Sequence, residues 1–359
     1  MLVRRLWLKD FRNYTGVELD LSDGVTAVVG ANGQGKTNLV ESIAWLARGS
    51  SFRGAVVDSM VRFGVDRAVI RAEVEDAGRT TLLEAELVVG GRNRLQVNHN
   101  RVSRQGDFVG HVSATIFGPD DLVLVKGGPA ERRRYLDDLL VDVASSNHGI
   151  RSDLDRILRQ RNSLLRQAGG RNTPEVSTSL DVWDSKLCEV GGDLVARRID
   201  LLDELAPVAG GLVRSLSNGR SELQMSYECA WGGDGLAASL ARARPDDLRR
   251  GTSTVGPHRD EVGLSIDGLS ARGHASQGEQ RSLAVALRLA GHRVVTSHTG
   301  SDPVILLDDV FSELDPDRAA ALIELLPQTQ TVVTTAGDLP AGVTADRKIS
   351  VEGGVVMPA

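Results

Sequence analysis

A glycine-rich loop near the N-terminus constrains the fold of this chain more than any other feature. Residues 30–37 read GANGQGKT, which fits the pattern G-x-x-x-x-G-K-[ST]. The loop follows an apolar run, Val25 to Val29, and precedes a helical pattern that covers Asn38 to Ala47. Backbone N–H groups and a helix N-terminus can then surround phosphate oxygens, whereas an ordinary glycine turn requires neither flank. The sequence therefore predicts an α/β fold that binds a nucleotide.

The residues of this loop have distinct expected roles. Lys36 is expected to bridge the β- and γ-phosphates of ATP and so to act in catalysis, and the Thr37 hydroxyl is expected to bind Mg²⁺. The predicted nucleotide contacts in this segment are Gly30, Ala31, Asn32, Gly33, Gln34, Gly35, Lys36, Thr37 and Asn38.

A pair of carboxylates follows a second apolar run, Pro303 to Leu307, whose composition is typical of a strand buried in a parallel sheet. Asp308, at the end of this run, is expected to hold Mg²⁺ through water. Asp309 is placed to orient or deprotonate the attacking water. Two aspartates that only cap a strand are the alternative, and the phosphate-binding loop in the same chain favours the catalytic interpretation.

A third segment, Ser276-Gln277-Gly278-Glu279-Gln280, comes directly before another helical pattern. Such a segment can offer a phosphate a hydroxyl, an uncovered backbone and the positive end of a helix dipole. By itself it is more typical of an ordinary helix cap. Its position ahead of the Asp308 strand is what favours a role at a phosphate.

The rest of the chain divides into a β-rich and a helical part. The first 120 residues contain short β-branched apolar runs between turn residues. From Glu131 to about Leu216 apolar residues recur at helical spacing in two stretches, which the linker 169–174 separates. The short linker predicts an antiparallel helical hairpin, with two helices of an ordinary bundle as the alternative. A helix over 317–326 and a buried strand over 331–335 are expected near the C-terminus.

Composition excludes several classes of protein. With 42 Lys and Arg against 48 Asp and Glu, the net charge is −6, so the chain is not uniformly basic, although a local basic patch is compatible with this balance. Two cysteines exclude a disulfide framework and a multi-cysteine zinc site.

Because no apolar run approaches the roughly 18 residues of a membrane span, we expect a cytoplasmic protein without a membrane partner. Aromatic residues make up only 4% of the chain, which argues against recognition of single strands by base stacking.

Together and in this order, the motifs resemble the ATP-binding-cassette ATPases of the SMC-like DNA-repair group, and within that group the RecF family. Further segments spread over residues 8–315 carry the resemblance. They are 8–14 (LKDFRNY), 51–53 (SFR), 117–122 (FGPDDL), 127–137 (GGPAERRRYLD), 256–260 (GPHRD) and 306–315 (LLDDVFSELD).

The resemblance implies a P-loop ABC/SMC-like ATPase head of two lobes with a short antiparallel helical arm. Residues 1–117 would then form the N-terminal part of lobe I, with the P-loop. Residues 118–298 would form lobe II, with the arm and the signature motif 276–280. Residues 299–359 would complete lobe I with the Asp308 strand.

The resemblance also implies a function. Proteins similar to this family are weak DNA-dependent ATPases that dimerise on ATP, bind double-stranded or gapped DNA, and help RecR and RecO type mediators to load recombinase in replication, recombinational repair and the SOS response to DNA damage. In the ATP-dependent homodimer, Ser276 and Gly278 would face the partner's γ-phosphate, with Gln277 and Glu279 beside them. Asp315 would couple the two sites. The implied location is the cytoplasm, at the nucleoid.

Departures from the pattern of related ATPases predict slow hydrolysis. Asp309 is one methylene shorter than the glutamate common at this place, and a misplacement of about 1 Å can cost on the order of 100-fold in rate. The signature lacks the transporter form Leu-Ser-Gly-Gly-Gln, and Thr335 stands where a switch histidine is common. The glutamine usual in the loop between the lobes has no counterpart within 117–121. These features favour a slow conformational switch over a fast motor.

Several basic residues are further candidates. Arg12 and Asn13 follow the first strand and are expected to approach the nucleotide, with a solvated turn as the alternative. Arg53 is a candidate phosphate or DNA contact, or a plain surface residue, and His258 is expected to make a structural hydrogen bond. The first arm helix has six arginines against two aspartates, an excess that predicts contact with the backbone of duplex DNA or else a solvated face. The DNA-binding candidates are Arg151, Arg156, Arg159 and Arg161.

Two other functions are considered. The nucleotide-binding subunit of a transporter would carry a transporter-type signature and a switch histidine, and would lack a long arm. A small-molecule phosphotransferase would use the P-loop alone, which leaves the signature and the loop 312–315 unexplained. The chain matches neither expectation.

Overall fold

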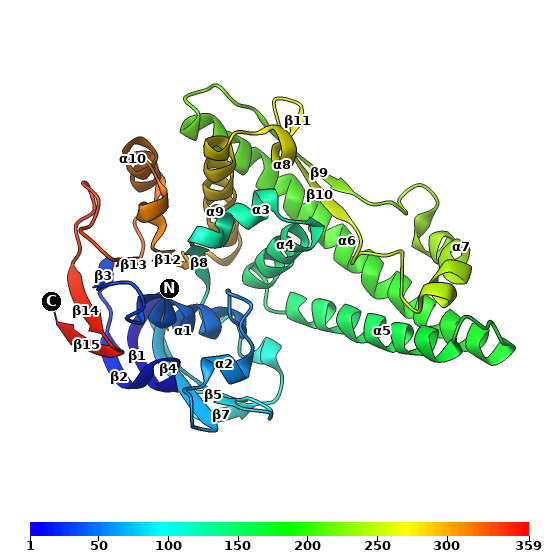
Figure 1. Cartoon of the computed structure of the whole chain (residues 1–359), viewed down its shortest axis with the longest axis horizontal. Coiled ribbons are helices and arrows are strands. Elements are labelled where there is room, and N and C mark those ends of the chain that lie inside the picture. The colour runs from blue at the N-terminus through cyan, green and yellow to red at the C-terminus, as the bar shows by residue number, and fades with distance from the viewer. Residues whose placement is uncertain (359) are drawn as a thin grey trace. The chain divides into compact units, whose positions relative to one another are not determined.

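The computed structural model describes residues 1–358, except for the side chain of Glu313, and divides into two compact units. Unit 1 is Met1–Asp121 with Arg281–Ala359, and unit 2 is Leu122–Gln280 (Figure 1). The sequence-based division falls instead after residues 117 and 298. Helix α9 (Gln277–Thr299) accounts for the second difference. His292 Nδ1 lies 3.0 Å from Thr115 Oγ1, and Arg288 Nε donates to Asp121 at 2.9 Å, so most of this helix packs with unit 1.

A six-stranded sheet in unit 1 contains the apolar runs as neighbouring strands, in the order β15-β14-β3-β13-β12-β8. All neighbours are parallel except the β14 and β15 pair. The strands are β3 (Val25–Val29), β8 (Ala114–Phe117), β12 (Val304–Asp308), β13 (Thr331–Thr335), β14 (Arg347–Glu352) and β15 (Val355–Pro358). Every residue of β12 and β13 is buried, as expected for central strands of a parallel sheet covered on both faces.

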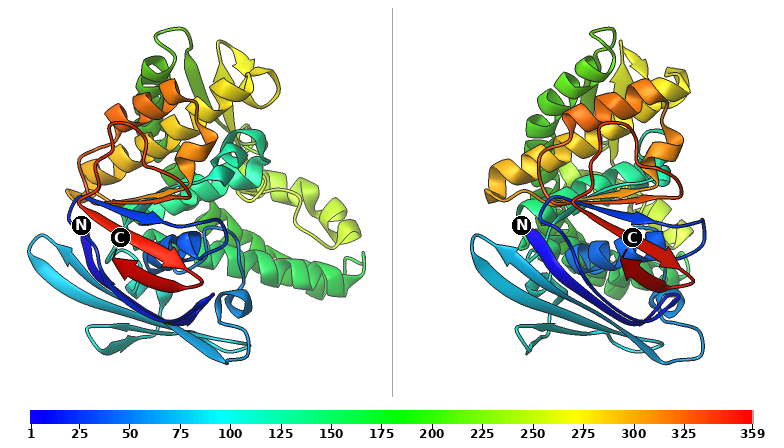
Figure 2. Two further views of the ribbon diagram at one scale, coloured as in Figure 1. Left: turned by 60° about the vertical axis from the view of Figure 1, so that its left-hand side comes forward. Right: turned by 90° about the vertical axis from the view of Figure 1, so that its left-hand side faces the viewer.

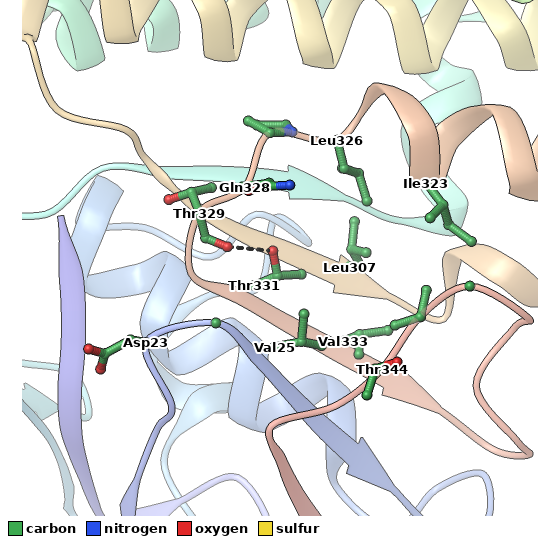
Figure 3. Close-up of a pocket in the computed structure, with 14 residues that line it drawn as sticks. Asp23, Val25, Leu307, Ile323, Leu326, Gln328, Thr329, Thr331, Val333 and Thr344 are labelled. Carbon is green, nitrogen blue, oxygen red and sulfur yellow. Dashed lines mark hydrogen bonds between the residues drawn. The ribbon is translucent and has the colours of Figure 1, made fainter.

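Helices cover the two faces of this sheet (Figure 2). Leu306 and Val332 belong to the core that contains α1 (Lys36–Arg48). Their neighbours Leu307 and Val333 point the other way, toward α10 (Pro316–Leu325), because successive side chains of a strand alternate between faces. Under α10 these residues line a pocket of about 400 Å³ whose wall is mostly apolar (Figure 3).

A second, antiparallel sheet of unit 1 has the order β2-β1-β4-β5-β6-β7. Its strands are β1 (Leu2–Phe11), β2 (Tyr14–Asp20), β4 (Arg67–Asp76), β5 (Arg79–Val88), β6 (Arg94–Val97) and β7 (Asn100–Val102). Burial alternates along β4, and its inward residues share one core with α1 and the parallel sheet. Helix α1 is therefore buried along most of its length, which holds its N-terminus in a fixed place.

Short elements connect the strands of unit 1, and unit 2 is mainly helical. The connecting elements are α2 (Val57–Met60) and the 3₁₀ turns η1 (Gln105–Asp107), η2 (Pro119–Leu122) and η3 (Val310–Glu313). Unit 2 contains α3 (Val123–Lys126), α4 (Pro129–Val143), α5 (Asn147–Ala168), α6 (Pro174–Leu216), β9 (Leu223–Glu228), α7 (Gly235–Arg250), β10 (Glu261–Ile266), β11 (Leu269–Ser270) and α8 (Ala271–His274). No helix within residues 1–358 combines the length and the apolar character that crossing a bilayer requires.

The predicted helical hairpin of unit 2 is confirmed. Helices α5 and α6 lie side by side and run in opposite directions (Figure 1). Gly169 ends α5 in a left-handed conformation, and the Thr173 hydroxyl caps α6 by accepting from Val176 N–H. Leu165, Ala168 and Leu180 pack together at the tip of the arm.

The arm also contains a buried ion-pair network around Arg161. This side chain has 0% exposure, and it donates to Asp184 at 2.6 Å, to Asp247 at 2.7 Å and to Ser253 Oγ at 2.8 Å. The network joins α5, α6 and α7. The prediction that Arg161 contacts DNA is therefore wrong, because helical periodicity turns this one arginine inward, away from solvent.

The three other arm candidates remain accessible to different degrees. Arg151 pairs with Asp138 at 2.7 Å, and Arg156 pairs with Asp153 one helical turn away at 2.8 Å. Arg159 is exposed, and among the described residues it has no ion-pair partner. Of the predicted DNA contacts on the arm, Arg159 alone thus presents a fully available guanidinium.

The Arg161 network generates a stability prediction. Replacing Arg161 by Met removes the cation and leaves Asp247, whose side chain is fully buried, without its charged partner. We expect a loss of about 3–5 kcal/mol of unfolding free energy in urea denaturation followed by circular dichroism. The matched variant Arg159→Met changes an exposed arginine two residues away and should unfold like the wild type. Equal stability of the two variants would contradict this assignment.

His292 generates a pH prediction. Burial lowers the pKa of His292 to about 4, against the charge of Asp302, whose carboxylate lies 3.8 Å from Nε2. The unfolded chain, with an ordinary histidine pKa of about 6.5, binds the extra proton between these values, so stability falls as pH decreases through that range. From His292 alone we expect the free energy of unfolding to decrease by about 2 kcal/mol between about pH 7 and pH 5. The variant His292→Gln should show a shallower pH dependence in urea titrations, and an unchanged dependence would exclude His292 as its source.

Candidate nucleotide-binding site

The glycine loop connects β3 to α1 and places its backbone at the N-terminus of that helix. Two glycines are needed there for space as well as conformation. Gly30 and Gly35 have φ of 155° and 122°, which disfavour other residues. A Cβ on Gly30 would overlap the Val351 carbonyl oxygen, and one on Gly35 would collide with the Asn13 amide. The side of the loop next to Val351 and Asn13 is therefore closely packed, and the loop runs directly into the N-terminus of α1.

The turns of two hairpins, β1–β2 and β14–β15, hold the backbone of the loop in place. The carbonyl of Gln34 accepts from Asn13 Nδ2 at 2.7 Å and from Gly354 N–H at 3.1 Å, and the Gln34 side chain accepts from Gly353 N–H at 2.6 Å. The Tyr14 hydroxyl donates to the Gly35 carbonyl at 2.9 Å. Asn13, predicted as a nucleotide contact, is thus seen here as a support of the loop.

The Lys36 ammonium lies across the loop and donates to the carbonyls of Gly30 at 2.7 Å and Ala31 at 3.0 Å. Burial lowers the pKa of Lys36, and the carboxylates of Asp309 and Asp308 oppose that shift. The three charged groups are therefore close enough to interact, as the expected catalytic arrangement requires. The loop carbonyls are exchangeable partners that this ammonium could leave for a phosphate.

Thr37 and Asp308 meet although 271 positions separate them in the chain. The Thr37 hydroxyl donates to Asp308 Oδ1 at 2.9 Å, and Thr334 Oγ1 donates to the same oxygen at 2.9 Å. Burial raises the pKa of Asp308, while the two hydroxyl hydrogen bonds and the charge of Arg53 act in the opposite direction. A hydroxyl and a carboxylate beside a phosphate-binding loop are the hard oxygen ligands that suit Mg²⁺. The side chains present here therefore fit this ion.

Sequence reasoning missed Thr334, which links the two aspartates. Its hydroxyl accepts from the backbone N–H of Asp309 at 3.0 Å while donating to Asp308. Asp309 has φ of 51°, a left-handed conformation that is uncommon for a residue other than glycine, and the Thr334 bond supports it. The available signal was a threonine in an apolar strand, whose register opposite Asp308 only the sheet reveals.

Buried Glu41 of α1 holds a second group of residues near the loop. Arg12 donates to both Glu41 oxygens at 2.8 and 2.7 Å, and Ser51 Oγ donates to Oε1 at 2.5 Å. This arrangement fixes the segment that carries Arg53. Arg53 itself is exposed, and within the described part of the chain it forms no ion pair. Its guanidinium is near enough to lower the pKa of Asp308, which is consistent with a role at phosphate.

The signature segment forms a capping box at the start of α9. Ser276 N–H donates to Glu279 Oε2 at 2.7 Å, and Glu279 N–H donates to Ser276 Oγ at 3.3 Å. Asp315 likewise caps α10 by accepting from Arg318 N–H at 2.9 Å. The helix cap expected as the alternative for the signature segment is therefore present. Contact of Ser276, Gln277, Gly278, Glu279 or Asp315 with a nucleotide remains a prediction.

His258 makes the structural contact expected of it. Its Nε2 lies 3.1 Å from the Ser253 carbonyl, and burial lowers its pKa to about 4. The histidine is therefore neutral in the folded chain near neutral pH and is part of the loop that follows α7.

Comparison with known proteins identifies the family of this site. The RecF/RecN/SMC N terminal domain matches residues 2–339. The DNA replication and repair protein RecF of Streptomyces avermitilis is 42% identical over 374 residues, which cover 99% of both chains. This chain belongs to the RecF family. A second relative, RecF of a Nocardioides species, is 41% identical over 409 residues and covers 97% of both chains.

Solved structures agree with this membership and with the ABC/SMC-like fold. The recombination mediator protein RecF with ATP, from the RecFOR pathway, is 29% identical and has a TM-score of 0.92, with 99% of this chain and 97% of that chain covered. An Smc head bound to the C-winged helix domain of ScpA is 17% identical and has a TM-score of 0.60, with 100% and 98% covered, which shows the fold alone. The resemblance that the motifs indicated is thereby confirmed for RecF and for the two-sheet ATPase head.

The Thr334 bridge generates a catalytic prediction for this RecF-family ATPase. Thr334→Val keeps the shape of the side chain but removes the hydroxyl that joins Asp308 to the Asp309 backbone. We expect ATP turnover or Mg²⁺ affinity to fall about 10- to 100-fold, since supports of metal ligands typically have effects of this size. Thr334→Ser should restore activity, and Thr331→Val, in the same strand, should leave it unchanged. Steady-state hydrolysis across a Mg²⁺ titration measures this, and wild-type turnover by Thr334→Val would refute the bridge.

Proposed function

We propose that this chain is an ATP-dependent DNA-binding switch of DNA replication and recombinational repair. The observation that supports it best is the contact of Thr37 with Asp308 beside Lys36 in a member of the RecF family. Relatives in that family are named for replication and repair, and a solved RecF contains ATP and belongs to the RecFOR pathway. The nucleotide for this chain is accordingly ATP.

The catalytic roles follow from the geometry of the site. Thr37 and Asp308 hold Mg²⁺, which when bound supplies positive charge to the β- and γ-phosphates. Lys36 leaves the loop carbonyls for the phosphates, and the loop N–H groups of residues 30–38 surround them. Asp309 orients the attacking water. Because its short side chain extends from a backbone tied to Thr334, hydrolysis is slow, and a bound ATP persists long enough to act as a signal.

Closure of a homodimer completes the site. Ser276 and Gly278 face the γ-phosphate held by the partner, with Gln277 and Glu279 beside them, and Asp315 couples the two sites. Asn13 supports each P-loop through the Gln34 carbonyl, Arg12 is held by Glu41 of α1, and both approach the nucleotide. ATP stabilises the closed dimer because the γ-phosphate contacts both subunits only in that state, which is how nucleotide binding shifts the population.

The closed dimer binds double-stranded or gapped DNA and helps RecR and RecO type mediators to load recombinase. Met1–Asp121 and Arg281–Ala359 act as lobe I, and Leu122–Gln280 acts as lobe II with the helical arm. Arg151, Arg156 and Arg159 of the arm remain candidates for DNA contact, whereas Arg161 is excluded by its burial. The place of action is the cytoplasm, at the nucleoid.

Sedimentation velocity tests this proposal. We expect the wild type to dimerise with ATP but not with ADP or without nucleotide, and duplex DNA to co-sediment with the dimer alone. Lys36→Ala removes the ammonium that bridges the phosphates, so it should stay monomeric and lose about 100-fold or more in ATP hydrolysis. The control variant Arg159→Ala changes a residue of α5 that is not part of the P-loop, so it should dimerise normally. A monomer under every condition would overturn the composite site.

A further inference from the structure

A stretch of unit 1 that the motifs above do not include is free of acidic residues. Residues 87–106 contain four arginines and one histidine but no aspartate or glutamate, in a chain with 48 acidic residues among 359. The arginines are Arg92, Arg94, Arg101 and Arg104. Acid-free stretches also occur at 156–174 and 280–301, which lie in helices α5 and α9 and the arm linker, whereas residues 87–106 form an edge of a sheet. This segment is therefore a candidate for a basic surface.

The segment folds into the hairpin of β6 and β7 at one edge of the antiparallel sheet. Leu95 is buried in the core of unit 1, and Val97 and Val102 pack against that core. Because side chains alternate along a strand, Arg94, Gln96 and Arg101 lie on the opposite face. Gln96 pairs directly with Arg101, so Arg94 and Arg101 are diagonal neighbours, about 7–8 Å apart at Cα.

The hairpin is held rigidly at its turn. Asn98 and His99 have φ of 49° and 65°, the left-handed pair that a tight two-residue turn requires. Asn98 N–H donates to the Leu82 carbonyl, and Leu82 N–H donates to Asn98 Oδ1, both at 2.8 Å. The arginines on this ribbon are therefore presented by a fixed backbone, and ordering it costs little when a ligand binds.

The charges of the hairpin are available to a ligand. Arg92, Arg101 and Arg104 are exposed, and within residues 1–358 none of them lies within ion-pair distance of a carboxylate. Arg94 contacts Glu86 at 3.1 Å, and Glu86 also pairs with Arg67 at 2.9 Å. The cluster of Arg67, Glu86 and Arg94 therefore keeps a net positive charge. One or two charges of either sign would suffice to protect an edge strand from aggregation. That need does not account for four charges of one sign.

We propose that the β6–β7 hairpin, residues 92–104, binds the phosphate backbone of duplex DNA. The inference rests on the proposed DNA-binding function and assigns it a surface. Arginine guanidinium groups match phosphate oxygens in bidentate geometry, and the unpaired edge of β7 adds backbone donors. The outward residues Arg94, Gln96 and Arg101 include no aromatic or large apolar side chain. Base stacking and a protein interface would each need such a side chain, so duplex backbone is the ligand that fits.

A matched pair of triple variants tests the proposal. The hairpin variant is Arg92→Gln, Arg101→Gln and Arg104→Gln. The control variant is Arg79→Gln, Arg214→Gln and Arg220→Gln, which removes three exposed arginines elsewhere and so changes the net charge equally. Binding to fluorescent duplex DNA is measured by anisotropy in the presence of ATP at several salt concentrations, and ATP-dependent dimerisation confirms that each variant is folded.

The hairpin variant should bind DNA at least about 10-fold more weakly at about 0.1 M salt. The negative slope of log K against log salt should become shallower by about 2 to 3. The control variant should retain wild-type affinity and slope. Equal binding by the two variants overturns the hairpin assignment and leaves the proposed function intact. Failure of the wild type itself to bind DNA with ATP overturns both.

Chemical protection of the wild-type protein supplies a second readout that needs no variant. Phenylglyoxal modifies exposed arginines, and mass spectrometry of peptides reports each one. With ATP present, duplex DNA should protect Arg92, Arg101 and Arg104 but not Arg79, Arg214 or Arg220. Unchanged modification of the hairpin arginines would contradict the proposal even if the triple variant bound poorly.

Discussion

A single buried carboxylate, Asp308, connects the parts on which this structure depends. It lies at the end of the most deeply buried strand, and hydroxyl groups from Thr37 and Thr334 both donate to its Oδ1. A charged group in such a place is costly unless hydrogen bonds or a cation compensate it, and here the first turn of α1 and the neighbouring strand β13 each supply a hydroxyl donor. The order of strands in the sheet supplies one of these donors, because β13 lies between β12 and β3 and brings Thr334 beside Asp308.

Packing against the core side of the P-loop explains how its phosphate-binding side can remain exposed. Helix α1 is buried between the two sheets of unit 1, and the turn Gly353-Gly354 and Asn13 hold the Gln34 carbonyl and side chain from behind. The P-loop N–H groups are consequently pre-organised rather than ordered by the nucleotide. This arrangement is compatible with tight ATP binding and slow hydrolysis, since the binding groups are rigid while Asp309 is short and held in a left-handed conformation.

Arginines serve two opposite purposes in this chain, and their surroundings separate the two. Arg161 and Arg198 are buried and paired, with Arg198 donating to both oxygens of Asp137 at 2.7 and 2.8 Å, so they join helices and strands of unit 2. Arg92, Arg101 and Arg104 have no such partner among the described residues. Arg101 lies on β7, and Arg92 and Arg104 flank the hairpin. A buried guanidinium loses hydration, which carboxylates and neutral acceptors such as Ser253 Oγ replace here, whereas an exposed guanidinium remains hydrated and accessible.

The sequence by itself determined the P-loop and the acidic pair, because each consists of residues close together in the chain. It also determined the family, because the order of such local motifs over residues 8–315 can be read without a fold. Strand, loop and helix are local, and the spacing of Gly30, Lys36 and Thr37 is readable without a fold. The helical arm was predictable for the same reason, since apolar periodicity over residues 150–201 is a local signal.

Only the tertiary structure decided what depends on register and on the direction of a side chain. Thr334 reaches Asp308 because two parallel strands align, and no local pattern specifies that alignment. Arg161 and Arg159 look alike in sequence, yet their helix turns one into an ion-pair network and the other into solvent. The lack of acidic residues over 87–106 is visible in the sequence, but only the pairing of β6 with β5 and β7 places Leu95 in the core and Arg94 and Arg101 on the opposite face.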